Sequence, residues 1–221
     1  MQARGSTMFA TAAALCCFAA NSSLCRLALR EDAIDAWSFT AVRLASGALV
    51  LALLVRCRSR TERDSRASFA SGAALFAYAA AFSLAYLRLS AGVGALVLFA
   101  SVQATMIGAS IRHGASPTRA EWTGLAIALA GLAVLARPGP IAPDALGLLL
   151  MASAGCAWGV YSLHGRTSQA PLATTAGNFL RSLPLALLGF CYGWPQMQLS
   201  TRGVGLAVAS GALASGVGYS L

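Results

Sequence analysis

Long apolar stretches separated by short polar connections cover almost the whole chain. Eight of them can be outlined, at residues 7–27, 36–55, 68–87, 91–111, 121–136, 145–164, 171–192 and 203–221. A helix that rises about 1.5 Å per residue needs about 20 apolar residues to cross the hydrocarbon core of a bilayer. The pattern therefore predicts an all-α polytopic membrane protein with seven crossings and a partial eighth, and makes the lipid bilayer its first partner.

The composition excludes an ordinary water-soluble domain. Of the 221 residues, 57% are hydrophobic and 10% are charged, whereas soluble domains carry about 25% charged residues. The net charge of +9 does not indicate a nucleic-acid partner, because the basic residues are scattered singly through short connections rather than interleaved with aromatic residues on one stripe.

The distribution of arginine predicts the orientation, since cytoplasmic loops retain basic residues. With the N-terminus inside, nine arginines fall on the cytoplasmic side: Arg4, Arg56, Arg58, Arg60, Arg63, Arg66, Arg112, Arg119 and Arg166. Five fall on the other side: Arg26, Arg30, Arg88, Arg137 and Arg202. The N-terminus is predicted to be cytoplasmic. The absence of lysine beside abundant alanine and glycine indicates a high-GC genome, which favours a bacterial inner membrane.

The sequence offers no ligand set for a metal or cofactor and no catalytic pair. Five cysteines, Cys16, Cys17, Cys25, Cys156 and Cys191, lie in or at the ends of apolar stretches, where cysteine behaves as a small hydrophobic residue. His113 and His164 stand in different connections, and no Asp or Glu lies deep in a stretch. An intramembrane enzyme needs a nucleophile beside a base, so an enzyme is not predicted, and neither is proton coupling through a buried carboxylate.

The chain contains an internal repeat. An offset of 140 residues places Cys16 on Cys156 and Arg26 on Arg166, and an offset of 138 places Arg43 on Arg181. At 139, residues 70–73 (Ala-Ser-Gly-Ala) recur at 209–212. A cleaved signal peptide is the alternative reading of the first 23 residues, and the repeat argues against it because those residues belong to the first copy.

Each repeat unit has five helices, an odd number, so the second copy enters the membrane from the opposite side. This is an inverted-topology repeat, a construction typical of secondary transporters. The predicted domains are residues 1–138, a complete first repeat, and 144–221, a second repeat of two to three helices. Measured against the first copy, the second lacks about 60 residues, and the chain is expected to be truncated at its C-terminus.

Several segments resemble EamA-type members of the drug/metabolite transporter superfamily. They are residues 18–21 (Phe-Ala-Ala-Asn), 39–54 with Arg43, 89–96, 122–131 and 154–159. The resemblance covers almost the whole chain and implies ten helices in two inverted repeats around a central substrate cavity. The chain departs from the family pattern where Ala115 follows Gly114 instead of a glutamate, and where the fourth stretch lacks its usual proline.

Arginine and other polar residues inside the stretches are the candidate substrate pathway, because a polar group facing lipid costs free energy. Arg43 and Arg181 are expected either to bind an anionic group of the substrate through their forked donors, or to reach an interface or exposed backbone carbonyls. For Arg181, Pro184 favours the second reading by removing the amide that would bond the carbonyl of Leu180.

The uncharged candidates are Asn21, Ser22, Gln103, Thr105, Trp158, Tyr161 and Asn178. Asn21 and Tyr161 are equivalent in the repeat and could face one shared cavity. Interhelical hydrogen bonding for the polar residues, and simple packing for Trp158, are the alternatives.

The predicted function is a secondary carrier of small metabolites or drugs, with export favoured, that works by alternating access. The alternative is a truncated membrane protein that does not transport. Gly155 and Gly159 predict a close helix approach, and Gly124 with Gly131 leaves open a contact within the chain or a homodimer.

Overall fold

The computed structural model describes residues 16–17, 19–30, 32–57, 67–135 and 143–217, and this part of the chain is almost entirely helical. Several predictions fall outside the described residues: the start of the stretch at 7–27, the arginines at 4, 58, 60, 63, 66 and 137, and the repeat boundary near Pro138.

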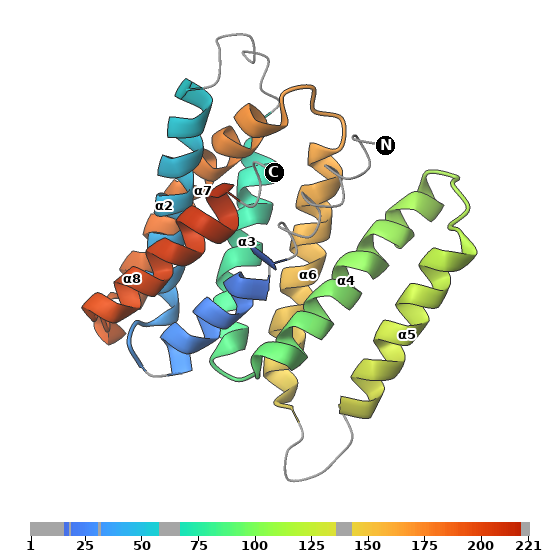
Figure 1. Cartoon of the computed structure of the whole chain (residues 1–221), viewed down its shortest axis with the longest axis horizontal. Helices are drawn as coiled ribbons and strands as arrows, with labels where there is room; N and C mark the ends of the chain where they lie inside the picture. Colours follow the sequence, from blue (N-terminus) through green and yellow to red (C-terminus); the bar gives the residue numbers. More distant parts are fainter. Residues whose placement is uncertain (1–15, 18, 31, 58–66, 136–142, 218–221) are drawn as a thin grey trace.

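The helices follow the predicted stretches closely (Figure 1). Residues 19–30 form an N-terminal helix. The others are α2 (Ala36–Cys57), α3 (Phe69–Tyr86), α4 (Ala91–Arg112), α5 (Arg119–Leu135), α6 (Ala145–Gly165), α7 (Pro171–Gly193), the 3₁₀ turn η1 (Trp194–Gln196), α8 (Thr201–Ala209) and the π-helical η2 (Ser210–Val217).

Four of these helices, α2, α3, α4 and α6, are long and apolar enough to cross a membrane. The 22 residues of α2 extend about 33 Å, enough to cross the hydrocarbon core of about 30 Å. Helix α5 is shorter, at 17 residues, and α7 carries Asn178 and Arg181 within its length. An α-helical membrane protein is thus the class to which this architecture belongs.

Polar side chains mark the helix starts. Ser68, Asp144 and Ser200 each accept a bond from the amide three residues ahead, at 3.1, 2.7 and 3.0 Å. Thr118 and Glu121 form a reciprocal capping box: the Glu121 amide donates to Thr118 Oγ1 at 3.3 Å, and the Thr118 amide donates to Glu121 Oε2 at 2.6 Å.

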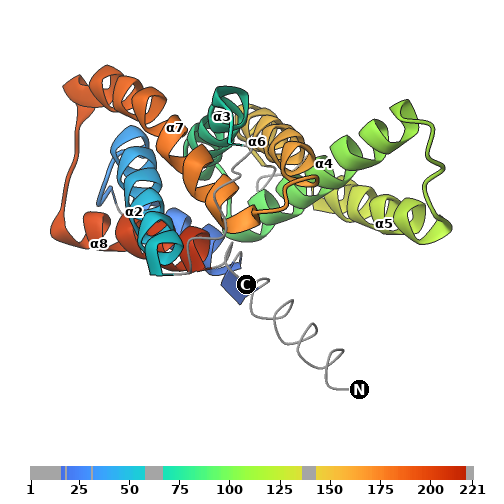
Figure 2. The ribbon, with the colours of Figure 1, turned by 90° about the horizontal axis from the view of Figure 1, so that it is seen from above.

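The centre of the bundle is built from α2 packed on α7 and from α3 packed on α6, with η2 lying against α2. Helix α4 packs on α6 where Gly155 and Gly159 face Leu98 and Thr105, so the predicted close approach is confirmed. Helix α5 packs on α4 alone among the described elements, and the two project from one side of the bundle (Figure 2). Gly131 faces Leu96 of α4, while Gly124 faces open space.

Helices α3 and α6 run in opposite directions. The C-terminal end of α3 meets the start of α6, where Gly147 contacts Arg88 and Leu89, whereas Ser71 near the start of α3 lies beside His164 at the end of α6. Arg26 donates to the Tyr86 carbonyl at 2.7 Å, at the C-terminal end of α3. Arg26 and Arg166, which caps the far end of α6, therefore lie at opposite ends of the bundle.

A short backbone bridge joins two connections at the end that holds Arg26. Ile34 pairs with Leu199 in an isolated antiparallel bridge. The Asp35 amide donates to the Gln198 carbonyl at 3.1 Å, and the Gln198 amide donates to Asp35 Oδ2 at 3.2 Å. The bridge ties the connection before α2 to the connection before α8.

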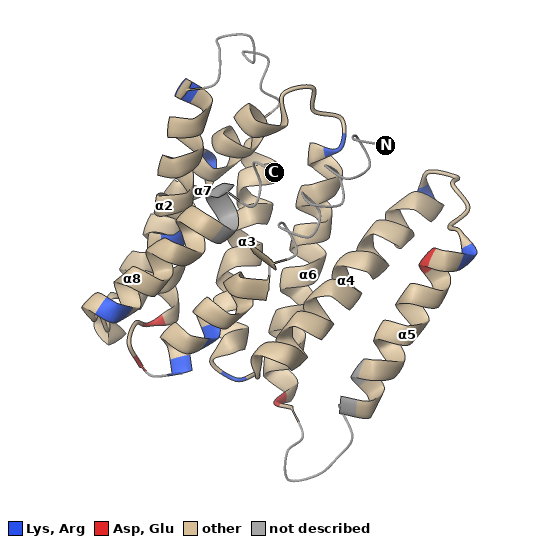
Figure 3. Ribbon diagram, in the orientation of Figure 1, with Lys and Arg blue, Asp and Glu red and all other residues tan. Residues whose placement is uncertain are grey.

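Charged residues of the described ranges gather at the helix ends, with long uncharged stretches between them (Figure 3). Arg43 and Arg181 are the exceptions, since both lie well inside their helices. These two buried or half-buried arginines are the candidates for a functional site inside the bundle.

Candidate functional site

Arg43 is enclosed in the centre of the bundle. Its side chain is 2% exposed, and its Nη2 donates to Tyr78 Oη at 3.0 Å. The guanidinium carbon lies 5.1 Å from the centroid of the Tyr78 ring and 5.0 Å from that of Phe82. Cation–π contacts of this kind are strongest away from water, so the aromatic face of α3 holds the charge in place.

Tyr78 also links Arg43 to residues far along the chain. Asn21 Nδ2 donates to the same Tyr78 hydroxyl at 3.4 Å, and Ser210 Oγ donates to Asn21 Oδ1 at 2.6 Å. We call Asn21, Arg43, Tyr78 and Ser210 the Tyr78 network. All four are buried, and each comes from a different element: the N-terminal helix, α2, α3 and η2.

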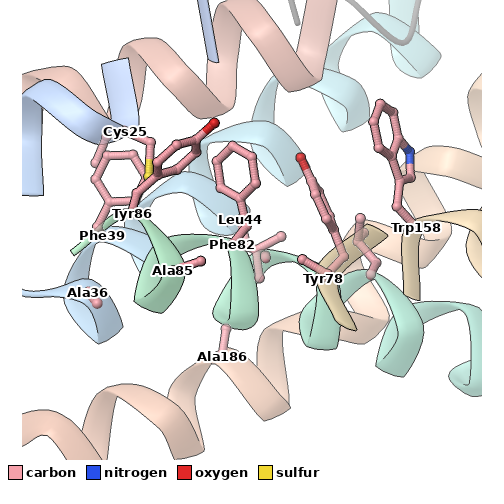
Figure 4. Close-up of a cluster of buried hydrophobic side chains, with 14 of the residues drawn as sticks. Cys25, Ala36, Phe39, Leu44, Tyr78, Phe82, Ala85, Tyr86, Trp158 and Ala186 are labelled. Atoms are coloured by element: carbon pink, nitrogen blue, oxygen red, sulfur yellow. The ribbon is translucent and has the colours of Figure 1, made fainter. Parts of the chain in front are cut away.

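Aromatic rings flank the Tyr78 network in a row that runs along α3 and on to α6 (Figure 4). The centroids of Tyr86 and Phe82 are 4.7 Å apart, and those of Phe82 and Tyr78 are 5.4 Å apart. Trp158 stacks on Tyr78 at 5.5 Å with an interplanar angle of 27°. The structure therefore brings Trp158 together with two other predicted site residues, Asn21 and Arg43, around a tyrosine.

Tyr161 and Asn178 form a second polar group, between α6 and α7. Tyr161 and Asn178 are both buried and line one cavity with Thr175, and Asn178 Oδ1 accepts from the Ser68 amide at 3.1 Å. This cavity has a volume of about 150 Å³. Asn21 and Tyr161 thus occupy two separate polar groups, because Asn21 faces α3 and η2 whereas Tyr161 faces α7.

Arg181 has surroundings unlike those of Arg43. It is half-buried, its Nη1 donates to the Gly177 carbonyl at 3.1 Å, and its guanidinium carbon lies 5.8 Å from the Phe69 ring. The predicted bond to a backbone carbonyl is present, but at Gly177 rather than Leu180. Long helical side chains point back toward the N-terminus, which brings the carbonyl four residues earlier within reach.

The remaining predicted residues are dispersed. Ser22 is buried in the N-terminal helix. Thr105 Oγ1 donates to the Ser101 carbonyl at 2.7 Å within its own helix, and Gln103 lines a surface cavity beside α4.

Sequence reasoning missed Tyr78 and Ser210, on which the network depends. Tyr78 lies in the middle of an apolar stretch, where a buried hydroxyl needs a hydrogen-bonding partner. That requirement could have singled it out. Ser210 belongs to the repeated Ala-Ser-Gly-Ala segment, and its sequence equivalent Ser71 lies 3.3 Å from His164 Nδ1.

The two Ala-Ser-Gly-Ala segments make matching contacts. Gly72 packs against α7 at Arg181, where an added Cβ would come within 2.9 Å of the Arg181 Cβ. Gly211 packs against α2 at the Arg43 carbonyl and the Ser46 hydroxyl. In each case the glycine leaves no room for a side chain, so two helix crossings depend on it.

The chain is 48% identical over 215 residues to an uncharacterized protein of Pseudomonas aeruginosa, PA1977. The match covers 97% of this chain and 75% of the relative. No protein-family model matches the chain, and no solved structure matches it. This chain therefore belongs to the same family as PA1977 of P. aeruginosa.

Proposed function

We propose that this protein is a secondary carrier of small metabolites or drugs, with the Tyr78 network on the path of the substrate. The observation that carries the proposal is the enclosure of a guanidinium, an amide and two hydroxyls at the junction of four elements of an apolar helical protein. Burial of such groups costs free energy. A path for polar solutes is a function that would explain why these groups are buried despite this cost.

Matching contacts support two inverted repeats, residues 1–138 and 144–221. If the N-terminal helix corresponds to α6, α2 to α7 and α3 to the α8–η2 segment, a two-fold arrangement requires contacts to occur in exchanged pairs. Ser71 contacts α6 and Ser210 contacts the N-terminal helix. Gly72 contacts α7 and Gly211 contacts α2. Both pairs meet the requirement, as expected for the proposed EamA-type architecture.

The backbone bridge between Ile34 and Leu199 suggests how the carrier changes state. It joins the first proposed repeat to the second at one end of the bundle. Alternating access by rocking of two repeats opens one end while the other is closed. We propose that the bridge holds this end closed and that its two segments separate when the carrier opens at this end.

The proposed location is a bacterial inner membrane with the N-terminus in the cytoplasm. Arg56 and Arg112 lie in the last turns of α2 and α4, Arg119 begins α5 and Arg166 caps α6, all at the end of the bundle opposite to Arg26. The end that holds Arg26 also holds Asp35 and Asp144. The described arginines are four at each end, so the predicted excess comes from the sequence positions Arg4, Arg58, Arg60, Arg63 and Arg66, and an excess of arginine is typical of the cytoplasmic side.

The test is counterflow of labelled solutes into proteoliposomes containing the full chain, with amino acids, nucleobases and cationic drugs as probes. For a solute that is transported, Arg43→Met is expected to abolish the signal. Thermal stability should change little, because an apolar side chain of similar volume replaces a charge that is costly to bury. Arg181→Met is the matched control and should retain transport to within about twofold.

Two outcomes contradict the proposal. One is that no probe shows counterflow with the wild-type chain. The other is that Arg43→Met transports as well as Arg181→Met, which would mean that Arg43 serves the packing of the bundle alone.

A further inference from the structure

A second polar feature lies outside the Tyr78 network, between the C-terminal ends of α4 and α6. A cavity of about 480 Å³ is lined there by His113, Val160, Leu163, His164, Arg166 and Thr167. We call it the α4–α6 basic cavity. A second hollow of about 300 Å³, lined by residues of α4, by Pro117 and Glu121, and by Arg166, adjoins it, so Arg166 lines both spaces.

The charges around the cavity are unbalanced. Its lining contains one guanidinium, two imidazoles and no carboxylate. The adjoining hollow contains Glu121, whose carboxylate already accepts from the Thr118 amide and hydroxyl at 2.6 and 2.9 Å. Across the described ranges the one ion pair joins Arg88 and Asp144, at the other end of α6. Arg166 therefore has no carboxylate partner there.

The walls of the cavity divide into a basic mouth and an apolar interior. His113, His164 and Arg166 are exposed at the helix ends. Val160 lies one turn before His164 on the same face of α6 and is 40% exposed, and Leu163 directly precedes His164. Four residues correspond to about 6 Å along a helix. This arrangement suits a ligand with an anionic head and an apolar tail that enters from the side of the bundle.

Bases at helix C-termini also offset the negative end of the helix dipole, and this effect alone would explain one base per helix. It does not explain the convergence of three basic side chains from two helices on one cavity. A planar guanidinium pairs with a phosphate through two parallel bonds. Further donors are the His113 ring and Nε2 of His164, whose Nδ1 lies 3.3 Å from the Ser71 hydroxyl.

We propose that the α4–α6 basic cavity binds a phosphate ester, with the headgroup of an anionic phospholipid as its source in the membrane. The inference does not depend on transport. Anionic lipids concentrate in the leaflet that faces basic loops, and the cavity lies at the end where the sequence predicts the cytoplasmic surface.

The experiment is native mass spectrometry of the full chain released from detergent that contains phosphatidylglycerol or phosphatidylcholine. The wild-type chain is expected to retain phosphatidylglycerol preferentially. Arg166→Gln should reduce the retained phosphatidylglycerol about fivefold. Arg202→Gln, which removes an exposed arginine at the opposite end of the bundle, is the matched control and should leave it unchanged.

Glycerol 1-phosphate added to the same sample separates the two sources of phosphate. If it displaces phosphatidylglycerol at millimolar concentration, the cavity recognises the phosphate itself and a soluble ester can fill it. If it does not, the acyl chain on Val160 and Leu163 contributes and the ligand is the lipid. Equal retention of phosphatidylglycerol by Arg166→Gln and Arg202→Gln, with both variants monodisperse, would overturn the proposal.

Discussion

Arg43 and Arg181 occupy equivalent positions in the sequence repeat but have different surroundings. Arg43 is 2% exposed, lies over two aromatic rings of α3 and bonds a tyrosine on another helix. Arg181 is half-buried and bonds the backbone of its own helix. Both arginines face α3, and the residues that α3 presents to each one decide the difference. Tyr78 and Phe82 face Arg43, and Phe69 faces Arg181. The same sequence offset thus places one arginine inside the bundle among aromatic rings and the other on a helix surface, and the proposed path includes Arg43 alone.

The largest expected effect is on stability when each arginine is truncated. Arg43→Ala leaves a cavity beneath two aromatic rings and should lower the free energy of unfolding by about 2 to 4 kcal/mol. Arg181→Ala removes a partly exposed side chain and should cost less than about 1 kcal/mol. Thermal unfolding in detergent compares the two, and equal losses would remove the distinction between the two arginines.

The glycines beside these arginines sharpen the comparison. Gly72→Ala and Gly211→Ala each force a methyl group against the neighbouring helix and should cost about 1 to 3 kcal/mol. Gly92→Ala, where an added Cβ meets nothing within 4 Å, is the control and should be neutral or slightly stabilising because alanine favours a helix. If Gly72→Ala matches this control while Gly211→Ala does not, the two crossings are not equivalent.

A smaller effect is expected from the hydroxyl that Arg43 contacts. Tyr78→Phe removes the acceptor of two hydrogen bonds and keeps the ring, at a cost of about 1 kcal/mol. Tyr86→Phe, on the same face of α3, is the matched variant, and its hydroxyl donates to the Ala91 carbonyl at 3.4 Å. Transport should fall with Tyr78→Phe and persist with Tyr86→Phe. The reverse order would show that the path does not run past Tyr78.

The smallest effect concerns the ring beside Arg181. Phe69→Leu removes an exposed ring whose centroid lies 5.8 Å from the Arg181 guanidinium carbon. The free energy of unfolding should therefore fall by about 0.5 kcal/mol or less. A loss as large as that of Tyr78→Phe, in the same unfolding assay, would show that Arg181 depends on α3 as much as Arg43 does.

The helices could be predicted closely from the sequence because each consists of one long apolar stretch bounded by capping or charged residues. The start of α6 at Ala145 follows Asp144, and that of α3 at Phe69 follows Ser68. The change from α8 to the π-helical η2 at Ser210 was not predictable, because an apolar pattern does not reveal which backbone bonds form.

The site could be predicted in part. Asn21, Arg43 and Trp158 were singled out as polar or amphipathic groups in apolar stretches, and the structure gathers them at Tyr78. What the sequence could not supply was the register between helices, which decides that Asn21 meets α3 while Tyr161 meets α7. The Ile34–Leu199 bridge depends on that register too, because its residues are apolar and carry no turn or pairing signal of their own.

The central claim is that a five-helix repeat and a partial repeat of opposite orientation meet around the Tyr78 network, and side-specific labelling of single cysteines tests it most directly. After replacement of the native cysteines by serine, Arg26→Cys and Arg166→Cys occupy equivalent repeat positions at opposite ends of the bundle. In right-side-out and inverted vesicles, a membrane-impermeant maleimide should label Arg166→Cys from the cytoplasmic side and Arg26→Cys from the other side. Labelling of both from the same side would contradict the inverted repeat and, with it, the proposed carrier.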